Sequence, residues 1–279
     1  MTNSTRASVI LPAHNESAYL AQCLTALLAS ETDAVEVIVV ANACTDETAA
    51  IASQFAPQVL QKGWSLQVID TPIGGKLNAL NLGDAAARAD IRIYLDADVR
   101  PSPGLLGDLI AALSGDAPRF ASGTPMITQA TTFATRSYAR FWVRLPFVTQ
   151  GVPGFGIFGM NKPARARWGN WPDIISDDTF ARLHATPAER VRVPATYTWP
   201  MVEGFANLVR VRRRQNAGVA EVGAKFPALL EHDDTPGVPA LSTVGRFLRD
   251  PVGFCVYAAV ALTVRSPLFR SGDRWARGR

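Results

Sequence analysis

The chain has 279 residues, of which 48% are apolar and 19% are charged. This composition excludes a disordered protein, because disorder requires low hydrophobicity and high net charge. The cysteines, Cys23, Cys44 and Cys255, are too few and too widely spaced for a disulfide scaffold or a cysteine-rich zinc site.

The net charge of +4 is the sum of an acidic N-terminal part and a basic C-terminal part. Residues 1–100 carry 6 Lys and Arg against 11 Asp and Glu, whereas residues 205–279 carry 12 against 6. A basic C-terminal part is compatible with phosphates, nucleic acid or an anionic membrane surface as a partner.

The first hundred residues alternate between short apolar runs and helical patterns. Apolar runs predict strands at 8–12, 35–41, 66–70 and 90–95, and the segments between them predict helices at 16–30, 46–55 and 76–89. This alternation indicates βαβ units and a parallel sheet, in which ligands bind beyond the carboxyl ends of the strands.

Regular patterns are sparser after residue 100. The sequence predicts a strand at 120–127 and a helix at 177–184, with Ser176 as its N-cap. An uncharged run at 252–264 would span about 20 Å as a helix, which is too short to cross a bilayer core of about 30 Å. We expect it to be buried or to lie at an interface.

Two carboxylates, Asp96 and Asp98, follow the predicted strand at 90–95. Such a pair can hold a divalent cation that neutralises a diphosphate, because Mg²⁺ is usually held by one or two carboxylates and substrate phosphates. The alternative is a polar strand end in which Asp96 caps the next turn.

Five segments in a fixed order give this pair its context. They are residues 9–16, 37–46, 74–83, 96–98 and 176–179. Over about residues 7–220 the chain resembles family 2 glycosyltransferases, which are inverting enzymes that use nucleotide-sugars.

The resemblance implies an α/β GT-A fold, with a mostly parallel central sheet flanked by helices and a helical, partly interfacial C-terminal segment. Residues 1–220 would form the GT-A domain, with a nucleotide-binding half (1–100) and an acceptor and catalytic half (101–220). Residues 221–279 would form a basic, apolar extension at a membrane surface.

The resemblance also implies the donor-side residues. Pro12, Ala13 and Glu16 would contact the base and ribose, and Asn42 stands where the family usually has an aspartate that binds the base. Lys76 would lie near the base or the phosphates. Asp96 would lie on the sugar–ribose side, and Asp98 would bind the metal, Mg²⁺ or Mn²⁺.

The pair Asp177 and Asp178 matches the family's Glu-Asp pair, of which the second carboxylate is the general base. Asp178 is favoured because Thr179 follows it, as in the common Glu-Asp-Thr form. The alternative is an acidic helix start that is favoured by the macrodipole.

Two further sites are implied. Arg212 and Arg214 align with the Gln-x-x-Arg-Trp motif of processive members and would bind diphosphate or an anionic acceptor. Gln215 replaces the tryptophan, which indicates single addition. The alternative is a solvated basic helix face. His232 would reach the metal.

Aromatic and basic residues mix in segments 133–147 and 246–275, as in interfacial helices. We expect a lipid-linked or envelope-glycan acceptor, an anionic membrane surface as partner, and a cytoplasmic protein that is peripheral on that face of the membrane. The alternative is an ordinary packing helix with a basic tail.

Two other functions compete with sugar transfer. A sugar-phosphate nucleotidyltransferase needs a glycine-rich loop with Arg and Lys after the first strand, where this chain has Pro12 to Glu16. A nucleic-acid-binding protein could use the basic C-terminal region, but the sequence carries no known module of that kind. No nucleic-acid partner is expected.

Overall fold

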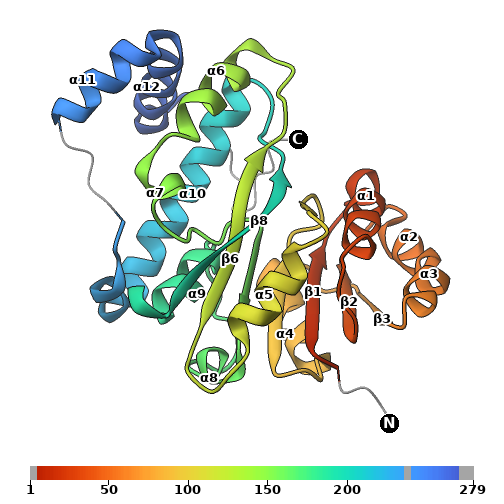
Figure 1. Ribbon diagram of the computed structural model, residues 1–279. Coiled ribbons are helices and arrows are strands. Elements are labelled where there is room, and N and C mark those ends of the chain that lie inside the picture. Colours follow the sequence, from red (N-terminus) through yellow and green to blue (C-terminus); the bar gives the residue numbers. More distant parts are fainter. Residues whose placement is uncertain (1–4, 236–239, 270–279) are drawn as a thin grey trace. The chain divides into compact units, whose positions relative to one another are not determined.

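The computed structural model describes residues 5–235 and 240–269, which form two compact units (Figure 1). Unit 1 comprises Met1–Met126, Gly154–Asp173 and His184–Trp199, and unit 2 comprises Ile127–Pro153, Ile174–Leu183 and Pro200–Arg279. The chain passes between the units several times. The boundary expected at residue 220 falls inside one long helix, Phe205–Lys225.

Unit 1 contains an eight-stranded sheet with the order β3-β2-β1-β4-β7-β6-β8-β5. The first four of these strands pair in parallel, whereas β4 with β7, β6 with β7, and β5 with β8 pair antiparallel. The strands are β1 (Ala7–Ala13), β2 (Val35–Asn42), β3 (Ser65–Thr71), β4 (Ile91–Leu95), β5 (Arg100–Pro101), β6 (Phe120–Ile127), β7 (Ile157–Met160) and β8 (Arg190–Trp199).

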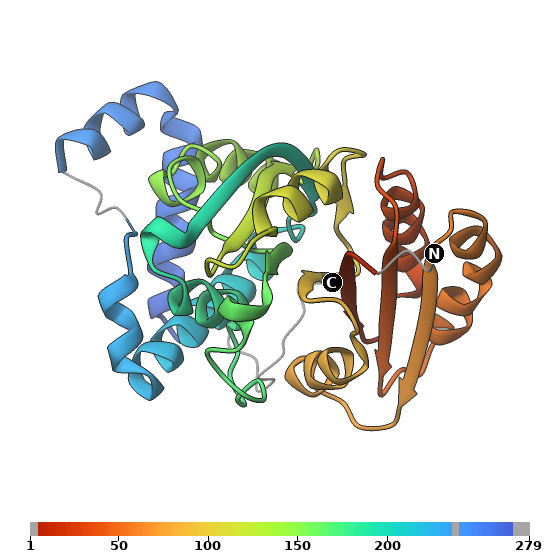
Figure 2. The ribbon, with the colours of Figure 1, turned by 60° about the horizontal axis from the view of Figure 1, so that its bottom comes forward.

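Helices cover both faces of the parallel strands. Figure 2 shows α4 on one side of β1 to β3 and α1 to α3 on the other. Successive side chains of β1 point to opposite faces of the sheet. Val9 and Leu11 join the core that includes Leu20 of α1, whereas Ile10 faces Gly83 of α4. The helices are α1 (Ser17–Leu28), α2 (Thr48–Gln54), α3 (Ala56–Gln61), α4 (Lys76–Ala86), α5 (Leu105–Leu113), α8 (Lys162–Arg165) and the 3₁₀ helix η1 (Pro187–Glu189).

Unit 2 is built mainly from helices around α10. Figure 1 shows α12 alongside α6 and α10, and both of these helices contact it. The elements of unit 2 are α6 (Phe133–Trp142), α7 (Pro146–Thr149), α9 (Asp177–His184), α10 (Phe205–Lys225), η2 (Pro227–His232), α11 (Ala240–Arg249) and α12 (Pro251–Arg265).

The predicted α/β fold is confirmed, with a parallel sheet in the first hundred residues and a helical C-terminal segment. The second half differs from the first because it contributes the antiparallel strands β7, β6 and β8. Among the described residues, no helix is both long enough and apolar enough to cross a bilayer.

Candidate functional site

The loops after β1 and β2 are held together at the carboxyl edge of the sheet. The register pairs Ala13 with Ala41, so the two strands end side by side. Beyond Ala13, the ring nitrogen Nδ1 of His14 lies 2.6 Å from the carbonyl oxygen of Asn42, and the backbone N–H of Glu16 donates to Thr48 Oγ1 at 2.8 Å. The predicted donor residues Pro12, Ala13 and Glu16 therefore belong to one connected edge.

Asp46 fixes the loop after β2, and the sequence had placed it at the end of the family segment 37–46 and at a helix start without a role. Its carboxylate accepts hydrogen bonds from the N–H groups of Ser17 at 3.1 Å and Thr48 at 3.0 Å. Burial opposes ionisation of Asp46, but the Thr48 and Ser17 hydrogen bonds outweigh burial and lower its pKa to about 2. The carboxylate therefore stays charged and ties α1 to the loop before α2.

Asn42 connects the strand ends to the loop before α4. Its side-chain nitrogen donates to the carbonyl of Ala13 at 2.7 Å, and its side-chain oxygen accepts from the N–H of Gly75 at 3.1 Å. The residue is 3% exposed. Its amide therefore already serves the protein's own backbone, and contact with a base stays a prediction.

Lys76 and Asp96 form an ion pair with 2.9 Å between Nζ and Oδ1. Lys76 is the first residue of α4, and Asp96 follows β4 directly. After β4, Asp96 and Asp98 are half-buried while Ala97 between them is buried. The structure thus brings Asp96, one of the two predicted cation ligands, next to Lys76, which is predicted to lie near the base or the phosphates.

Cys23 of α1 lies directly behind this turn. The thiol is fully buried and donates weakly to the carbonyl of Asp96, with 3.8 Å between sulfur and oxygen. Burial, together with the carboxylates of Asp96 and Glu16, raises the pKa of this thiol. Cys23 is therefore a neutral packing residue rather than a thiolate ligand.

A buried network that the sequence did not predict supports the end of β4. The Asp84 carboxylate accepts hydrogen bonds from Tyr94 Oη at 2.8 Å, from Arg165 Nη2 at 2.8 Å and from Trp171 Nε1 at 2.7 Å. Burial and the nearby Asp84 charge raise the pKa of Tyr94. Tyr94 precedes Asp96 by two residues, so the network holds the strand that carries the candidate cation ligands.

Asp177 and Asp178 open α9 in unit 2, as the sequence predicted. Asp177 is 5% exposed, whereas Asp178 is half-buried and its Oδ1 accepts from the N–H of Thr179 at 2.7 Å. Negative charge at a helix N-terminus is favourable. Of the two carboxylates, Asp178 is the more accessible to an acceptor.

The segment before α9 is packed tightly against α10. The N–H of Ile175 donates to Glu221 Oε2 at 2.9 Å. A Cβ placed on Gly218 would lie 2.9 Å from the Cγ2 of Ile175 and would also collide with the hydroxyl of Ser176. This close approach fixes the position of the helix start that carries the candidate base.

Arg212 and Arg214 lie on α10 and are half-buried rather than fully solvated. Arg212 Nη2 lies 3.4 Å from Tyr257 Oη of α12. Burial raises the pKa of Tyr138 to about 12, although the charge of Arg212 opposes this shift. Arg212 thus packs within unit 2, and binding of diphosphate by either arginine stays a prediction.

His232 ends η2, and its Nδ1 lies 2.8 Å from the carbonyl oxygen of Leu183. The residue belongs to unit 2, whereas Asp96 and Asp98 belong to unit 1. Within the part of the chain that the structure describes, no group of three or more His, Cys, Asp or Glu side chains is arranged to hold a metal ion. A role of His232 in metal binding stays a prediction.

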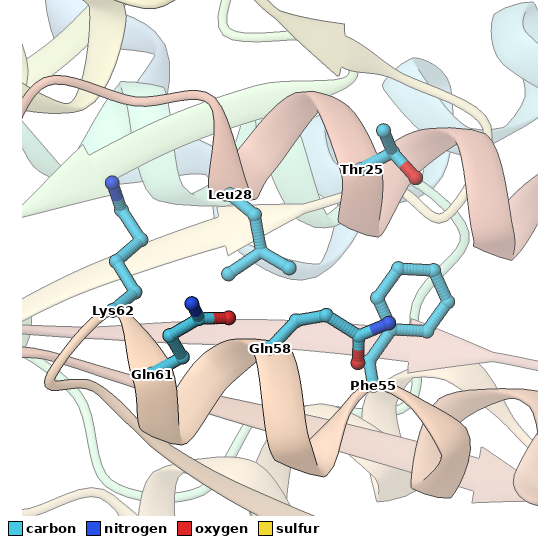
Figure 3. A pocket seen from close by; sticks show the side chains of 6 residues that line it. All are labelled: Thr25, Leu28, Phe55, Gln58, Gln61 and Lys62. Carbon is cyan, nitrogen blue, oxygen red and sulfur yellow. The ribbon is translucent and has the colours of Figure 1, made fainter.

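A cavity of about 460 Å³ lies between α1 and α3 (Figure 3). The Lys62 amine at its edge donates to the carbonyl of Ser30 at 2.6 Å. None of the predicted site residues lines it, because it lies toward the C-terminal end of α1, away from the strand ends that precede this helix. The lining residues are Thr25, Leu28, Phe55, Gln58, Gln61 and Lys62.

The parallel strands of unit 1, with polar loops at their carboxyl ends, define an α/β domain of the kind that binds ligands at this edge of the sheet. The sequence model of the family described as glycosyl transferase family 2 matches residues 8–182, which is more than half of the chain. The chain therefore belongs to this family.

A curated relative supports this membership. The probable glycosyltransferase YdaM of Bacillus subtilis (strain 168) is 28% identical over 244 residues, which cover 80% of this chain. The chain spans 57% of the length of that relative.

Solved structures share the fold at low sequence identity. The mannosyltransferase PcManGT from Pyrobaculum calidifontis, in complex with GDP-Man and Mn²⁺, matches with a TM-score of 0.62 and 18% identity over 95% of this chain and 76% of its own. TarS from S. aureus, in complex with UDP, matches with a TM-score of 0.53 and 15% identity over 93% of this chain and 91% of its own. These similarities establish a GT-A fold.

Proposed function

We propose that this protein transfers a sugar from a UDP- or GDP-sugar to an acceptor hydroxyl, with inversion at the anomeric carbon. The observation that carries the proposal is the ion pair between Lys76 and Asp96, at the edge where the loops after β1 and β2 meet α4. It places one cation and an accessible carboxylate where a parallel sheet binds nucleotides.

The residues after β4 fit a divalent cation. Asp96 and Asp98 are half-buried and would supply hard oxygen ligands, and two carboxylates suffice for a cation that shares the substrate's phosphates. When bound, such a cation offsets the charge of the diphosphate leaving group. The related mannosyltransferase structure contains GDP-Man and Mn²⁺, which supports the same type of donor here.

Lys76 would exchange one anionic partner for another. Its ammonium would bind a donor phosphate, while Asp96 would turn to the cation. Each charge would keep an opposite partner throughout, so the exchange would leave no unpaired charge. Pro12, Ala13, Glu16 and Asn42 would border the nucleoside.

Asp178 is the proposed general base. Inversion requires a carboxylate that takes the acceptor's hydroxyl proton while the oxygen attacks the anomeric carbon, and Asp178 is more exposed than Asp177. Gln215 stands where processive members carry tryptophan, which supports single addition. We propose a lipid-linked or envelope-glycan acceptor, reached at the cytoplasmic face of a membrane.

A thermal-shift screen of UDP- and GDP-sugars with Mn²⁺ tests the donor part, because a ligand specific for the folded state raises the melting temperature. We expect one nucleotide class to stabilise the protein only with the cation, and the effect to vanish in Asp98→Ala. Equal stabilisation of Asp98→Ala and the parent would contradict the assignment of the cation ligands. Absence of stabilisation by either nucleotide class would contradict the function.

A further inference from the structure

We propose that the outward face of the α11–α12 hairpin is a docking surface for an anionic lipid bilayer. The face consists of exposed apolar side chains of both helices and arginines beside them. It deepens the membrane part of the proposed function, and it is tested without a sugar nucleotide. The residues are Arg246, Phe247, Leu248, Arg249, Val252, Cys255, Ala259, Leu262 and Arg265.

The inner face of α12 packs against α6. Tyr257 lies with its ring centroid 5.0 Å from that of Phe141 and 5.4 Å from that of Tyr138, both on α6. Phe254 contacts Phe141 at 5.6 Å between centroids. These contacts fix which side of α12 points toward the unit and which side does not.

Arginine side chains hold both ends of α12 in place. Arg213 of α10 donates to the carbonyls of Thr263 at 3.1 Å and Ser266 at 2.8 Å, which caps the last turn. At the first turn, Asp250 accepts from the N–H of Gly253 at 2.9 Å and from Arg140 at 2.7 Å and 2.8 Å. These contacts at both ends oppose rotation of α12 about its axis, so its outer face stays exposed.

That outer face is apolar. Val252, Cys255, Ala259 and Leu262 are exposed and follow one another at intervals of three and four residues, which places them along one side of the helix. Val252 is 47% exposed and Leu262 is 67% exposed. A surface helix in water normally turns a polar face outward, and an apolar stripe of this kind indicates an interaction surface.

Helix α11 also exposes large apolar side chains. Leu248 is 73% exposed, and Phe247 is 40% exposed while its ring contacts Phe254 of α12 at 5.4 Å between centroids. This ring contact packs α11 against α12, while Leu248 and part of Phe247 stay exposed. Figure 1 shows α11 and α12 at one end of unit 2.

The charges around this face select the partner. Arg249 and Arg265 are exposed, and Arg246 is half-buried. Between residues 240 and 269 the sequence contains a single acid, Asp250, whose carboxylate is buried in its pairing with Arg140. Arginines on both helices, beside apolar side chains and with one paired acid in the segment, match an anionic lipid surface, where each such charge near the headgroups adds binding energy.

The same charges disfavour a second copy as the occupant. A twofold contact through this face would bring arginines of both copies together without acids to pair with them. A spanning orientation is also excluded for α12, since 15 residues extend about 22 Å and a bilayer core is about 30 Å thick. The helix would lie in the plane of the interface.

The test is sedimentation of the full chain with vesicles of phosphatidylcholine alone or with 30% phosphatidylglycerol added, the latter fraction being roughly that of an anionic leaflet. We expect binding to the anionic vesicles only, and release as salt is raised. Leu248→Gln with Leu262→Gln should weaken binding about tenfold or more, because two buried leucines are lost. Arg249→Gln with Arg265→Gln should abolish the preference for anionic lipid.

Matched controls make the result specific. Leu60 is 75% exposed and Ile73 is 64% exposed, both in unit 1, so Leu60→Gln with Ile73→Gln removes equal apolar surface elsewhere. Each variant must melt like the parent. Weak or equal sedimentation with both vesicle types would overturn the proposal, and so would an equal loss of binding in the control variant. It would also be overturned if the parent were a dimer and the Leu248 and Leu262 substitutions alone made it a monomer. None of these outcomes bears on donor binding.

Discussion

Lys76 Nζ and Asp96 Oδ1 lie 2.9 Å apart and join the start of α4 to the end of β4. The Lys76 side chain is 27% exposed and the Asp96 side chain 35% exposed. A pair this accessible to water adds little to stability, about 0–1 kcal/mol. Its value lies in holding two opposite charges ready at the edge where the proposed donor binds.

Lys76→Met should therefore lower affinity for the donor diphosphate while leaving the fold intact. A charge-assisted hydrogen bond contributes roughly 1.5–3 kcal/mol, so we expect about 10- to 100-fold weaker binding of the nucleotide with Mn²⁺. Isothermal titration calorimetry would measure it. Lys62→Met removes the same charge at the cavity beside α1 and should bind normally. If Lys76→Met binds the donor as tightly as the parent does, Lys76 does not contact the donor.

Asp178→Asn should abolish transfer and retain donor binding. Loss of a general base costs roughly 10²–10⁴-fold in rate, and the substitution preserves the size of the side chain. Single-turnover measurement of sugar transfer, with donor affinity measured in parallel, separates the two effects.

Asp177→Asn is the matched control, since it removes a carboxylate one residue away. Because Asp177 is buried and Asp178 is half-buried, we expect Asp177→Asn to keep more transfer activity. Should Asp177→Asn be the inactive variant, the base assignment would move by one residue.

The sequence predicted those parts of the site that depend on strand order alone. In a parallel sheet all strand ends meet at one edge, so Glu16, Asn42 and Asp96 could be placed there from their positions after apolar runs. The Asp84 network could not be found this way. Its partner Arg165 lies 81 residues along the chain and carries no pattern that links the two.

The C-terminal region shows the same limit. Apolar and basic residues were evident in the sequence from 246 onward, yet periodicity could not tell which side of α12 faces the unit. That choice depends on Tyr257 packing on α6 and on Arg213 capping the helix, which are contacts between distant segments. Likewise, the sequence left open whether the arginines of α10 bind an anion or form a solvated face, and it did not predict that Arg212 and Arg213 contact α12.

Glu203 should make unit 2 sensitive to acid. Its carboxylate accepts from the N–H groups of Thr131 at 2.8 Å and Thr132 at 3.0 Å. Burial opposes ionisation of Glu203, but these bonds and that of the Thr132 hydroxyl outweigh burial and lower the pKa to about 2. The folded pKa lies below the unfolded value, so its stabilisation is present above about pH 4.5 and is lost toward pH 2.

Glu203→Gln tests this linkage by thermal melting across pH. At pH 7 we expect the variant to melt a few degrees below the parent, roughly 1–2 kcal/mol less stable, because a charged acceptor is lost. The gap should narrow as the pH falls from about 4.5, where Glu203 of the unfolded parent begins to protonate, and should close near pH 2, where the folded parent protonates as well. Glu47→Gln removes an exposed carboxylate and should show no such gap. A constant gap from pH 7 to pH 3 would show that the ionised form of Glu203 is not the stabilising one.

Gly83→Ala should loosen α4 from the sheet even though alanine favours helix. A Cβ on Gly83 would collide with the Cγ2 of Ile10, a fully buried β-branched residue of β1. Overpacking costs about 1–3 kcal/mol, against an intrinsic helix gain of about 1 kcal/mol, so we expect net destabilisation in urea unfolding. Gly107→Ala in α5 is the control, because a Cβ there meets nothing within 4 Å and should stabilise.

A double-mutant cycle with Ile10→Ala isolates the contact, since Gly83→Ala should cost less when the colliding methyl group is gone. The same substitution tests the site. Lys76 is the first residue of α4, so a helix displaced from β1 carries its ammonium away from Asp96. We therefore expect Gly83→Ala to weaken donor binding as well as stability, and Gly107→Ala to leave donor binding unchanged. Destabilisation without any change in donor affinity would show that the position of α4 does not control the Lys76–Asp96 pair.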